Sequence, residues 1–157
     1  MNVVCLGRGA SMEKARAAGF AAAESRESFF ANADVLSLHL PLNAQTRGIV
    51  TAADLARMKP TALLVNTSRA GLVAEGALVG ALRQGRPGRA AIDVFEDEPV
   101  LGAQHPLLAM DNVLCTPHLG YVERRTYEMY LGTAFGNVAA FAAGQPRDVV
   151  NPEVLKR

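Results

Sequence analysis

The sequence predicts an α/β fold built on a parallel, doubly wound sheet with flanking helices. Short β-rich apolar runs alternate with longer stretches of helical periodicity, which is typical of βαβ units. The chain has 157 residues, 50% of them hydrophobic, which is enough for a domain of ordinary size with a substantial core.

Five short apolar runs are the candidate strands. Two of them contain the cysteines, Cys5 and Cys115, for which a buried reduced thiol is the ordinary role. A structural disulfide is the less favoured interpretation in a cytosolic enzyme. The runs are NVVCL, ADVLSLHL, ALLVNTS, AAIDVF and NVLCTP, at residues 2–6, 33–40, 62–68, 90–95 and 112–117.

Helical segments fill the intervals between these runs. Ser11 can cap the first helix, which stops at Gly19 because glycine readily adopts the left-handed conformation that ends a helix. Thr51 caps another helix, which ends before Pro60 since a residue preceding proline avoids the helical region. The predicted helices cover residues 11–16, 25–32, 52–58, 74–84 and 123–143.

Composition excludes several classes of partner. The formal net charge is +1 and the charged residues are interspersed, so no basic stripe for nucleic acid or lipid is present. The apolar runs are short and the first residues lack a signal-peptide pattern, which predicts a cytoplasmic protein without a membrane span. The cysteines and the three histidines are scattered, so no metal site is expected.

Three charged residues follow the last three predicted strands. Arg69 closes ALLVNTSR, Glu98 lies just beyond AAIDVF, and His118 follows NVLCTP. Carboxyl ends of parallel strands meet at the edge of the sheet where α/β proteins bind ligands. An arginine holds a carboxylate bidentately, a histidine transfers a proton near neutral pH, and a neighbouring carboxylate keeps that histidine charged.

The segments VNTSRAGLV, AAIDVFEDEP and NVLCTPHLG, in this order, resemble the D-isomer-specific 2-hydroxyacid dehydrogenases, from about Met1 to the closing DVVNPEVL. The resemblance implies a Rossmann-like fold, a homodimer and hydride transfer between NAD(P)H and a 2-oxo acid or D-2-hydroxy acid. It makes Arg69 the carboxylate-binding residue, His118 the acid or base, and Glu98, immediately before a proline, the partner of His118.

The resemblance also implies a set of cofactor-binding residues. Asp93 is expected to accept a hydrogen bond from the nicotinamide carboxamide, whereas His39 is expected in the cofactor wall and His105 in solvent. The predicted set is Gly7, Arg8, Ser11, His39, Leu40, Pro41, Thr46, Thr67, Ser68, Arg69, Asp93, His118 and Gly120.

The resemblance begins partway into the family's architecture. Residues 1–147 are expected to form a partial NAD(P)-binding domain without the first strand and the GxGxxG turn, with residues 148–157 returning to a substrate domain. The chain alone is therefore expected to have little dehydrogenase activity. A catalytically inactive fragment or paralogue that serves as an interaction module stays open as the alternative.

The Gly7-Arg8-Gly9 turn bears on the choice of cofactor. It is not read as a phosphate loop, because Met12 occupies the third glycine position of GxGxxG and no acid ends a strand about 20 residues later. In similar dehydrogenases that prefer NAD, an aspartate stands at the place of Gly7. Without that carboxylate, Arg8 and Ser11 can hold a 2′-phosphate, so the sequence favours NADP over NAD.

Overall fold

The computed structural model describes residues 1–156, which group into two compact units. The first unit comprises Met1–His118 and the second begins at Leu119. The division into a domain of residues 1–147 and a tail of residues 148–157 stays a prediction.

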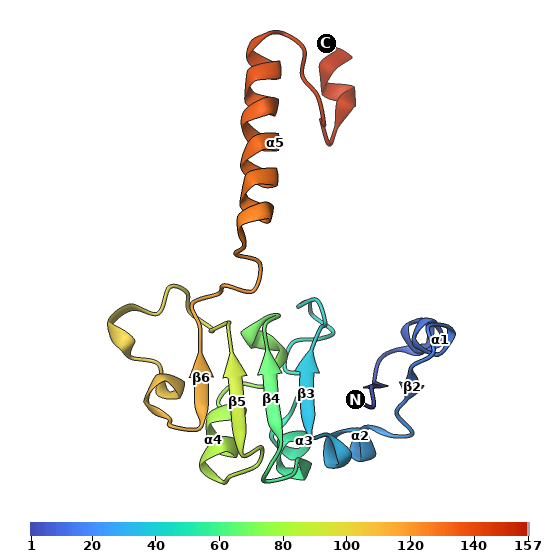
Figure 1. Cartoon of the computed structure of the whole chain (residues 1–157), viewed down its shortest axis with the longest axis vertical. Helices are drawn as coiled ribbons and strands as arrows, with labels where there is room; N and C mark the ends of the chain where they lie inside the picture. The colour runs from blue at the N-terminus through green and yellow to red at the C-terminus, as the bar shows by residue number, and fades with distance from the viewer. Residues whose placement is uncertain (157) are drawn as a thin grey trace. The chain divides into compact units, whose positions relative to one another are not determined.

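Parallel strands form two separate sheets within residues 1–156 (Figure 1). They are β1 (Val4–Cys5), β2 (Ala21–Ala22), β3 (Val35–Leu38), β4 (Leu63–Asn66), β5 (Arg89–Ile92) and β6 (Val113–Cys115). Strands β3 to β6 lie side by side in sequence order, and β1 pairs with β2. The parallel α/β fold is confirmed. The predicted strand at residues 2–6 does not join the main sheet, because β1 pairs with β2 in a sheet of its own.

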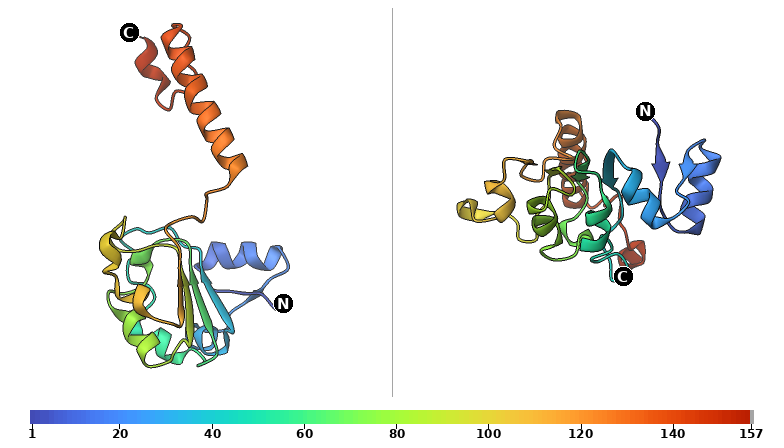
Figure 2. Two further views of the ribbon diagram at one scale, coloured as in Figure 1. Left: turned by 60° about the vertical axis from the view of Figure 1, so that its left-hand side comes forward. Right: turned by 90° about the horizontal axis from the view of Figure 1, so that it is seen from below.

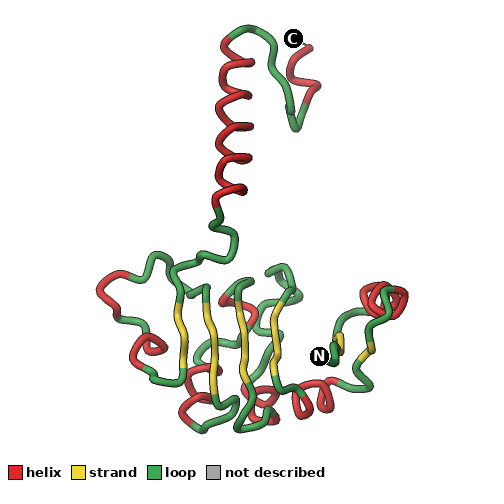
Figure 3. The backbone as a smooth tube through the Cα atoms, in the orientation of Figure 1, coloured by secondary structure: helices red, strands yellow, loops and turns green. Residues whose placement is uncertain are grey.

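Helices connect successive strands, as the colouring by secondary structure in Figure 3 shows. They are α1 (Gly9–Ala17), α2 (Arg26–Asn32), α3 (Ala52–Arg57), α4 (Ala77–Arg83) and α5 (Arg124–Ala142), with short 3-10 turns η1 (Ala70–Leu72), η2 (Leu101–Ala103), η3 (Pro106–Ala109) and η4 (Pro152–Lys156). No helix among these described residues is long and apolar enough to cross a membrane.

Two predicted helix starts are wrong. Helix α1 begins before Ser11, because the Arg8 carbonyl oxygen already accepts hydrogen bonds from the N–H groups of Ser11 and Met12. Helix α4 begins at Ala77 rather than Ala74, since Gly76 adopts a left-handed φ of 67° that interrupts the helical path.

The core lies between the main sheet and the helices α3 and α4, which share one face of it (Figure 2). Right-handed crossovers between neighbouring parallel strands place consecutive helices on the same face. Burial alternates accordingly along β3, where Leu36 is 2% exposed and Val35 59%. The helices α3 and α4 therefore cover the core on one face of the sheet. The loops that carry the polar residues begin at the ends of the strands.

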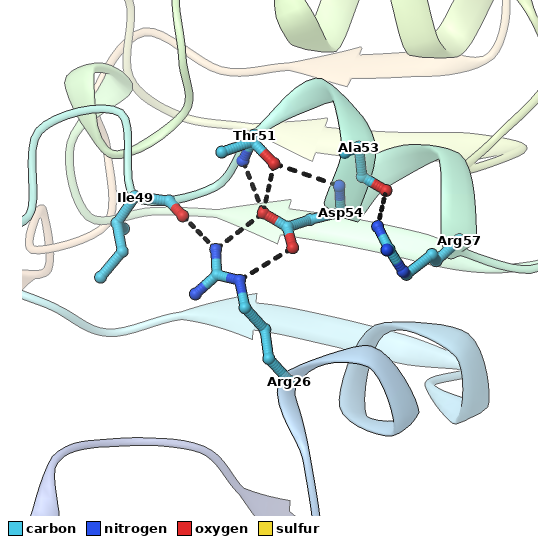
Figure 4. Close-up of polar contacts among 6 residues, drawn as sticks. All are labelled: Arg26, Ile49, Thr51, Ala53, Asp54 and Arg57. Carbon is cyan, nitrogen blue, oxygen red and sulfur yellow. Dashed lines mark hydrogen bonds and ion pairs between the residues drawn. The ribbon is translucent and has the colours of Figure 1, made fainter.

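A buried carboxylate joins the starts of α2 and α3 (Figure 4). Asp54, 5% exposed, accepts hydrogen bonds from Nε and Nη2 of Arg26 at 2.8 and 2.7 Å. It also accepts from the N–H and hydroxyl of Thr51 at 2.8 and 2.6 Å, and Arg26 donates to the Ile49 carbonyl oxygen. Burial raises the pKa of Asp54, but the hydrogen bonds from Arg26 and Thr51 outweigh it and lower the pKa from 3.8 to about 2.

Replacing Asp54 with asparagine is expected to lower the free energy of unfolding by about 1.5–3 kcal/mol at neutral pH, the usual contribution of hydrogen bonds to a charged group. The folded-state pKa lies below the unfolded one, so this stabilisation is complete above about pH 4 and is lost as the pH falls toward 2. Urea unfolding of both proteins at several pH values measures the difference.

Asp34→Asn is the matched control, because its 2.7 Å ion pair with Lys59 is exposed and such pairs contribute about 0–1 kcal/mol. The assignment would be contradicted if the difference in free energy of unfolding between the wild-type protein and Asp54→Asn stayed constant as the pH falls from 4 to about 2.

The second unit is built on α5. Glu123 caps this helix by accepting a hydrogen bond from the Thr126 N–H at 2.9 Å. Arg147 donates to the Asn137 side-chain oxygen at 2.9 Å and so ties the following segment back to the helix.

Candidate active site

The register of the main sheet brings the loops after β4, β5 and β6 to one edge. Asn66 at the end of β4 pairs with Ile92 at the end of β5, and Ile92 pairs with Cys115 at the end of β6. The residues that follow these three positions include the three predicted catalytic residues. The strand ends thus supply three neighbouring loops from one rigid support.

His118 and Glu98 form a close pair at this edge. The imidazole Nδ1 and the carboxylate Oε2 are 2.6 Å apart, and each side chain is 33% exposed. The Phe95 N–H donates to the other carboxylate oxygen at 2.8 Å. The hydrogen bond with His118 is the main reason that the pKa of Glu98 is lowered. The bond from Phe95 and the charges of His118 and Arg69 act in the same direction, against burial.

The backbone of His118 lies in the left-handed region, with φ at 56°. Its N–H donates to the Thr116 carbonyl oxygen at 3.1 Å, which closes a tight turn over Pro117. A non-glycine residue in this conformation costs about 1–2 kcal/mol. The fold therefore supports a strained backbone at the residue that presents the imidazole.

Asn66 organises the loop that carries Arg69. This residue is 2% exposed, and its side-chain amide donates to the Arg69 carbonyl oxygen at 3.0 Å while accepting from the Ser68 N–H at 3.1 Å. The Ser68 hydroxyl donates to the Leu40 carbonyl oxygen at 2.8 Å, and Arg69 Nη1 donates to the Ser68 carbonyl oxygen at 2.7 Å. Asn66 was not predicted as a site residue. The sequence pattern that could have indicated it is a polar amide at the end of an apolar strand.

Asp93 is buried at the same edge, only 4% exposed, and accepts a hydrogen bond from the Thr116 hydroxyl. Thr116 was not among the predicted residues. The hydrogen bond between these two side chains joins the end of β5 to the end of β6. Thr116 precedes His118 by two residues in the sequence. The contact of Asp93 with a nicotinamide carboxamide stays a prediction.

His105 is not solvent-facing, so that prediction is wrong. Its side chain is 18% exposed, with Nε2 lying 3.0 Å from Glu96 Oε2 and Nδ1 accepting from the Leu107 N–H at 3.3 Å. The ring packs edge-on against Phe95 at 5.0 Å between centroids. It therefore braces the loop between β5 and Glu98. The spacing of residues in the sequence did not indicate this role, because the contacts of His105 with Glu96 and Phe95 form only when the loop folds back on itself.

The predicted cofactor residues described next lie after β3, after β4 and in the second unit. Thr46 is buried and donates to the Pro41 carbonyl oxygen at 2.6 Å, whereas His39 is exposed, with Nε2 2.9 Å from the Ser37 hydroxyl. Leu40 is half-buried and Thr67 exposed at the ends of β3 and β4. Gly120 belongs to the second unit.

The Gly7 turn carries one charged donor, the Arg8 guanidinium, beside a residue without a side chain. A Cβ at Gly7 would lie 3.2 Å from Ser11 Cβ, so a side chain at this position requires a small shift of Ser11. Arg8 Nη1 donates to Gln45 Oε1 at 2.6 Å. Gln45 was not predicted, since a separation of 37 residues leaves no local pattern in the sequence.

Residues 1–120 match the family model described as D-isomer specific 2-hydroxyacid dehydrogenase, NAD binding domain. The chain is 46% identical over 133 residues to a glyoxylate reductase of Aeropyrum pernix, covering 84% of the chain and 39% of that protein.

Solved structures agree. The crystal structure of a putative D-3-phosphoglycerate dehydrogenase from Ralstonia solanacearum matches 99% of this chain and 45% of its own at 59% identity, with a TM-score of 0.91. A D-isomer specific 2-hydroxyacid dehydrogenase from Xanthobacter autotrophicus, in complex with NADPH and MES, matches 85% of this chain and 54% of its own at 38% identity, with a TM-score of 0.62. The chain thus spans about two fifths of the length of the reductase, and it belongs to the D-isomer-specific 2-hydroxyacid dehydrogenase family through its NAD-binding domain.

Proposed function

We propose that the protein reduces a small 2-oxo acid to a D-2-hydroxy acid with a nicotinamide cofactor. The observation that carries this proposal is the pairing of His118 with Glu98, close enough to Arg69 for its charge to act on the same carboxylate. A cation that binds a carboxylate, a proton donor and its counter-charge are the groups that this reduction requires.

In this mechanism Arg69 binds the substrate carboxylate through its guanidinium and polarises the adjacent carbonyl group. Glu98 engages Nδ1 of His118, and in this mechanism Nε2 donates the proton to the carbonyl oxygen. The contact with Glu98 also holds the imidazole ring in one orientation. The bound nicotinamide supplies the hydride, so one hydride and one proton convert the carbonyl to a hydroxyl group.

Glyoxylate is the first substrate to test, since it names the activity of the Aeropyrum relative. The full protein should consume NADPH or NADH in a saturable manner with glyoxylate, hydroxypyruvate or pyruvate. Cofactor binding without turnover on any 2-oxo acid would refute the proposal and favour an interaction module instead. The homodimer and the cytoplasmic location stay predictions.

For the cofactor we propose a preference for NADPH, supported by Gly7 and Arg8. Glycine presents no carboxylate to repel a 2′-phosphate, and the neighbouring guanidinium offers a charge-assisted hydrogen bond. The relative from Xanthobacter was crystallised with NADPH.

The double variant Gly7→Asp, Arg8→Ser is expected to shift the ratio of kcat/KM values toward NADH by roughly ten- to a hundredfold, the size of one charge-assisted contact. Steady-state kinetics with both cofactors measures this ratio. Gly7→Asn combined with Arg8→Ser, which adds a side chain of the same size without the charge, is the control for crowding against Ser11. A wild-type protein that strongly favours NADH would contradict the preference.

A further inference from the structure

We infer that Gln45 is a positioning residue for cofactor choice: its neutral amide holds the Arg8 guanidinium in place without neutralising the charge that a 2′-phosphate needs. This inference rests on the proposed NADPH preference. It assigns a role to a residue in a different loop, far from Arg8 in the sequence.

The contact joins the carboxyl ends of two separate sheets. Arg8 follows β1 and precedes α1, whereas Gln45 lies in the loop after β3. Within the described residues, the Arg8 guanidinium is held by one side-chain hydrogen bond, from Nη1 to Gln45 Oε1 at 2.6 Å. A long, exposed arginine otherwise samples many rotamers, and holding it in one of them lowers the entropy lost when an anion binds.

The charge of Arg8 stays unpaired within the residues that the structure describes. Ion pairs there join Arg26 to Asp54 and Arg124 to Glu128, but none involves Arg8. A glutamate in place of Gln45 would keep the shape of the contact and convert it into an ion pair. The change of one group from amide to carboxylate would then neutralise the positive charge offered to a phosphate.

Gln45 is itself held by a rigid turn. The Asn43 side-chain oxygen accepts from the N–H groups of Gln45 and Thr46 at 2.9 and 3.1 Å. The Thr46 hydroxyl, buried in the turn, donates to the Pro41 carbonyl oxygen at 2.6 Å. These bonds place the Gln45 backbone before any ligand arrives, so the position of Arg8 follows from a preorganised loop.

The test uses the full protein and two probes that differ only in the phosphate in question, 2′,5′-ADP and 5′-AMP, with dissociation constants from calorimetry. Gln45→Glu is expected to weaken binding of 2′,5′-ADP about tenfold or more and to leave 5′-AMP within about twofold. Gln45→Met, which keeps the length and loses the acceptor, is expected to weaken 2′,5′-ADP only a few-fold. Gln104→Glu adds the same charge in the loop between η2 and η3 and should change neither constant.

The outcomes separate the two proposals. If Arg8→Ser removes the preference for 2′,5′-ADP but Gln45→Glu leaves it intact, the role of Gln45 is refuted and the cofactor preference stands. If the wild-type protein binds both probes equally, the NADPH preference itself is refuted, and the role of Gln45 with it. The KM for NADPH in the Gln45 variants should rise in step with the dissociation constant of 2′,5′-ADP, while the KM for NADH changes little.

Discussion

Replacing His118 with glutamine is expected to lower the turnover of a 2-oxo acid by about 10²–10⁴-fold, the usual contribution of a positioned acid or base. Glutamine fills similar space and keeps a polar group near Glu98, but it cannot release a proton to the carbonyl oxygen. Cofactor affinity should change little, because the proposed role of the imidazole is at the reacting oxygen. Turnover and the dissociation constant of NADPH, measured on the same preparation, separate the two effects.

Glu98→Gln provides the matched comparison for this variant. It keeps the acceptor for the Phe95 N–H and removes the charge next to His118. Turnover should fall less than in His118→Gln, because the imidazole that is proposed to release the proton remains. A His118→Gln protein with near-normal turnover would mean that another group supplies the proton.

Replacing Arg69 with glutamine is expected to lower kcat/KM for the 2-oxo acid by about 10²–10³-fold, the loss typical of one donor that stabilises a developing oxyanion. The amide retains hydrogen-bonding capacity but neither the charge nor the fork that holds a carboxylate with two parallel bonds. Arg69→Lys restores the charge without the fork and should recover only part of the loss. Initial rates over a range of glyoxylate concentrations give kcat and KM for each variant.

The cofactor dissociation constant should stay nearly constant across both Arg69 variants, since the proposed partner of the guanidinium is the substrate carboxylate; in the described structure Arg69 Nη1 donates to the Ser68 carbonyl oxygen. An unchanged kcat/KM in Arg69→Gln would remove this residue from substrate binding. Loss of cofactor affinity alone would place it in the cofactor site instead.

The residues of the site could be predicted from the sequence because parallel strands align their ends. Arg69, Glu98 and His118 each follow an apolar run, so the register of the sheet alone brings their loops to one edge. The hydrogen bond between Glu98 and His118 agrees with this argument. Their catalytic roles stay proposals until the variants are measured.

Other features could not be predicted, because they depend on contacts between distant segments. Strand β2 is two alanines inside an alanine-rich stretch, where local composition does not distinguish strand from helix. The start of α4 depends on Gly76, whose left-handed conformation no periodicity reveals. Gln45 and His105 acquire their partners only when loops fold back on one another.

The sequential order of β3, β4, β5 and β6 in the main sheet has a consequence for biosynthesis. Every pairing joins neighbours in the chain, so the sheet can grow by one strand at a time as the polypeptide leaves the ribosome. Arg69 then emerges with an early strand, Glu98 follows, and His118 arrives after the final strand. In the proposed mechanism the proton donor is thus the last of the three groups to be placed, so a nascent chain that has not yet docked β6 has the guanidinium but not the imidazole in position.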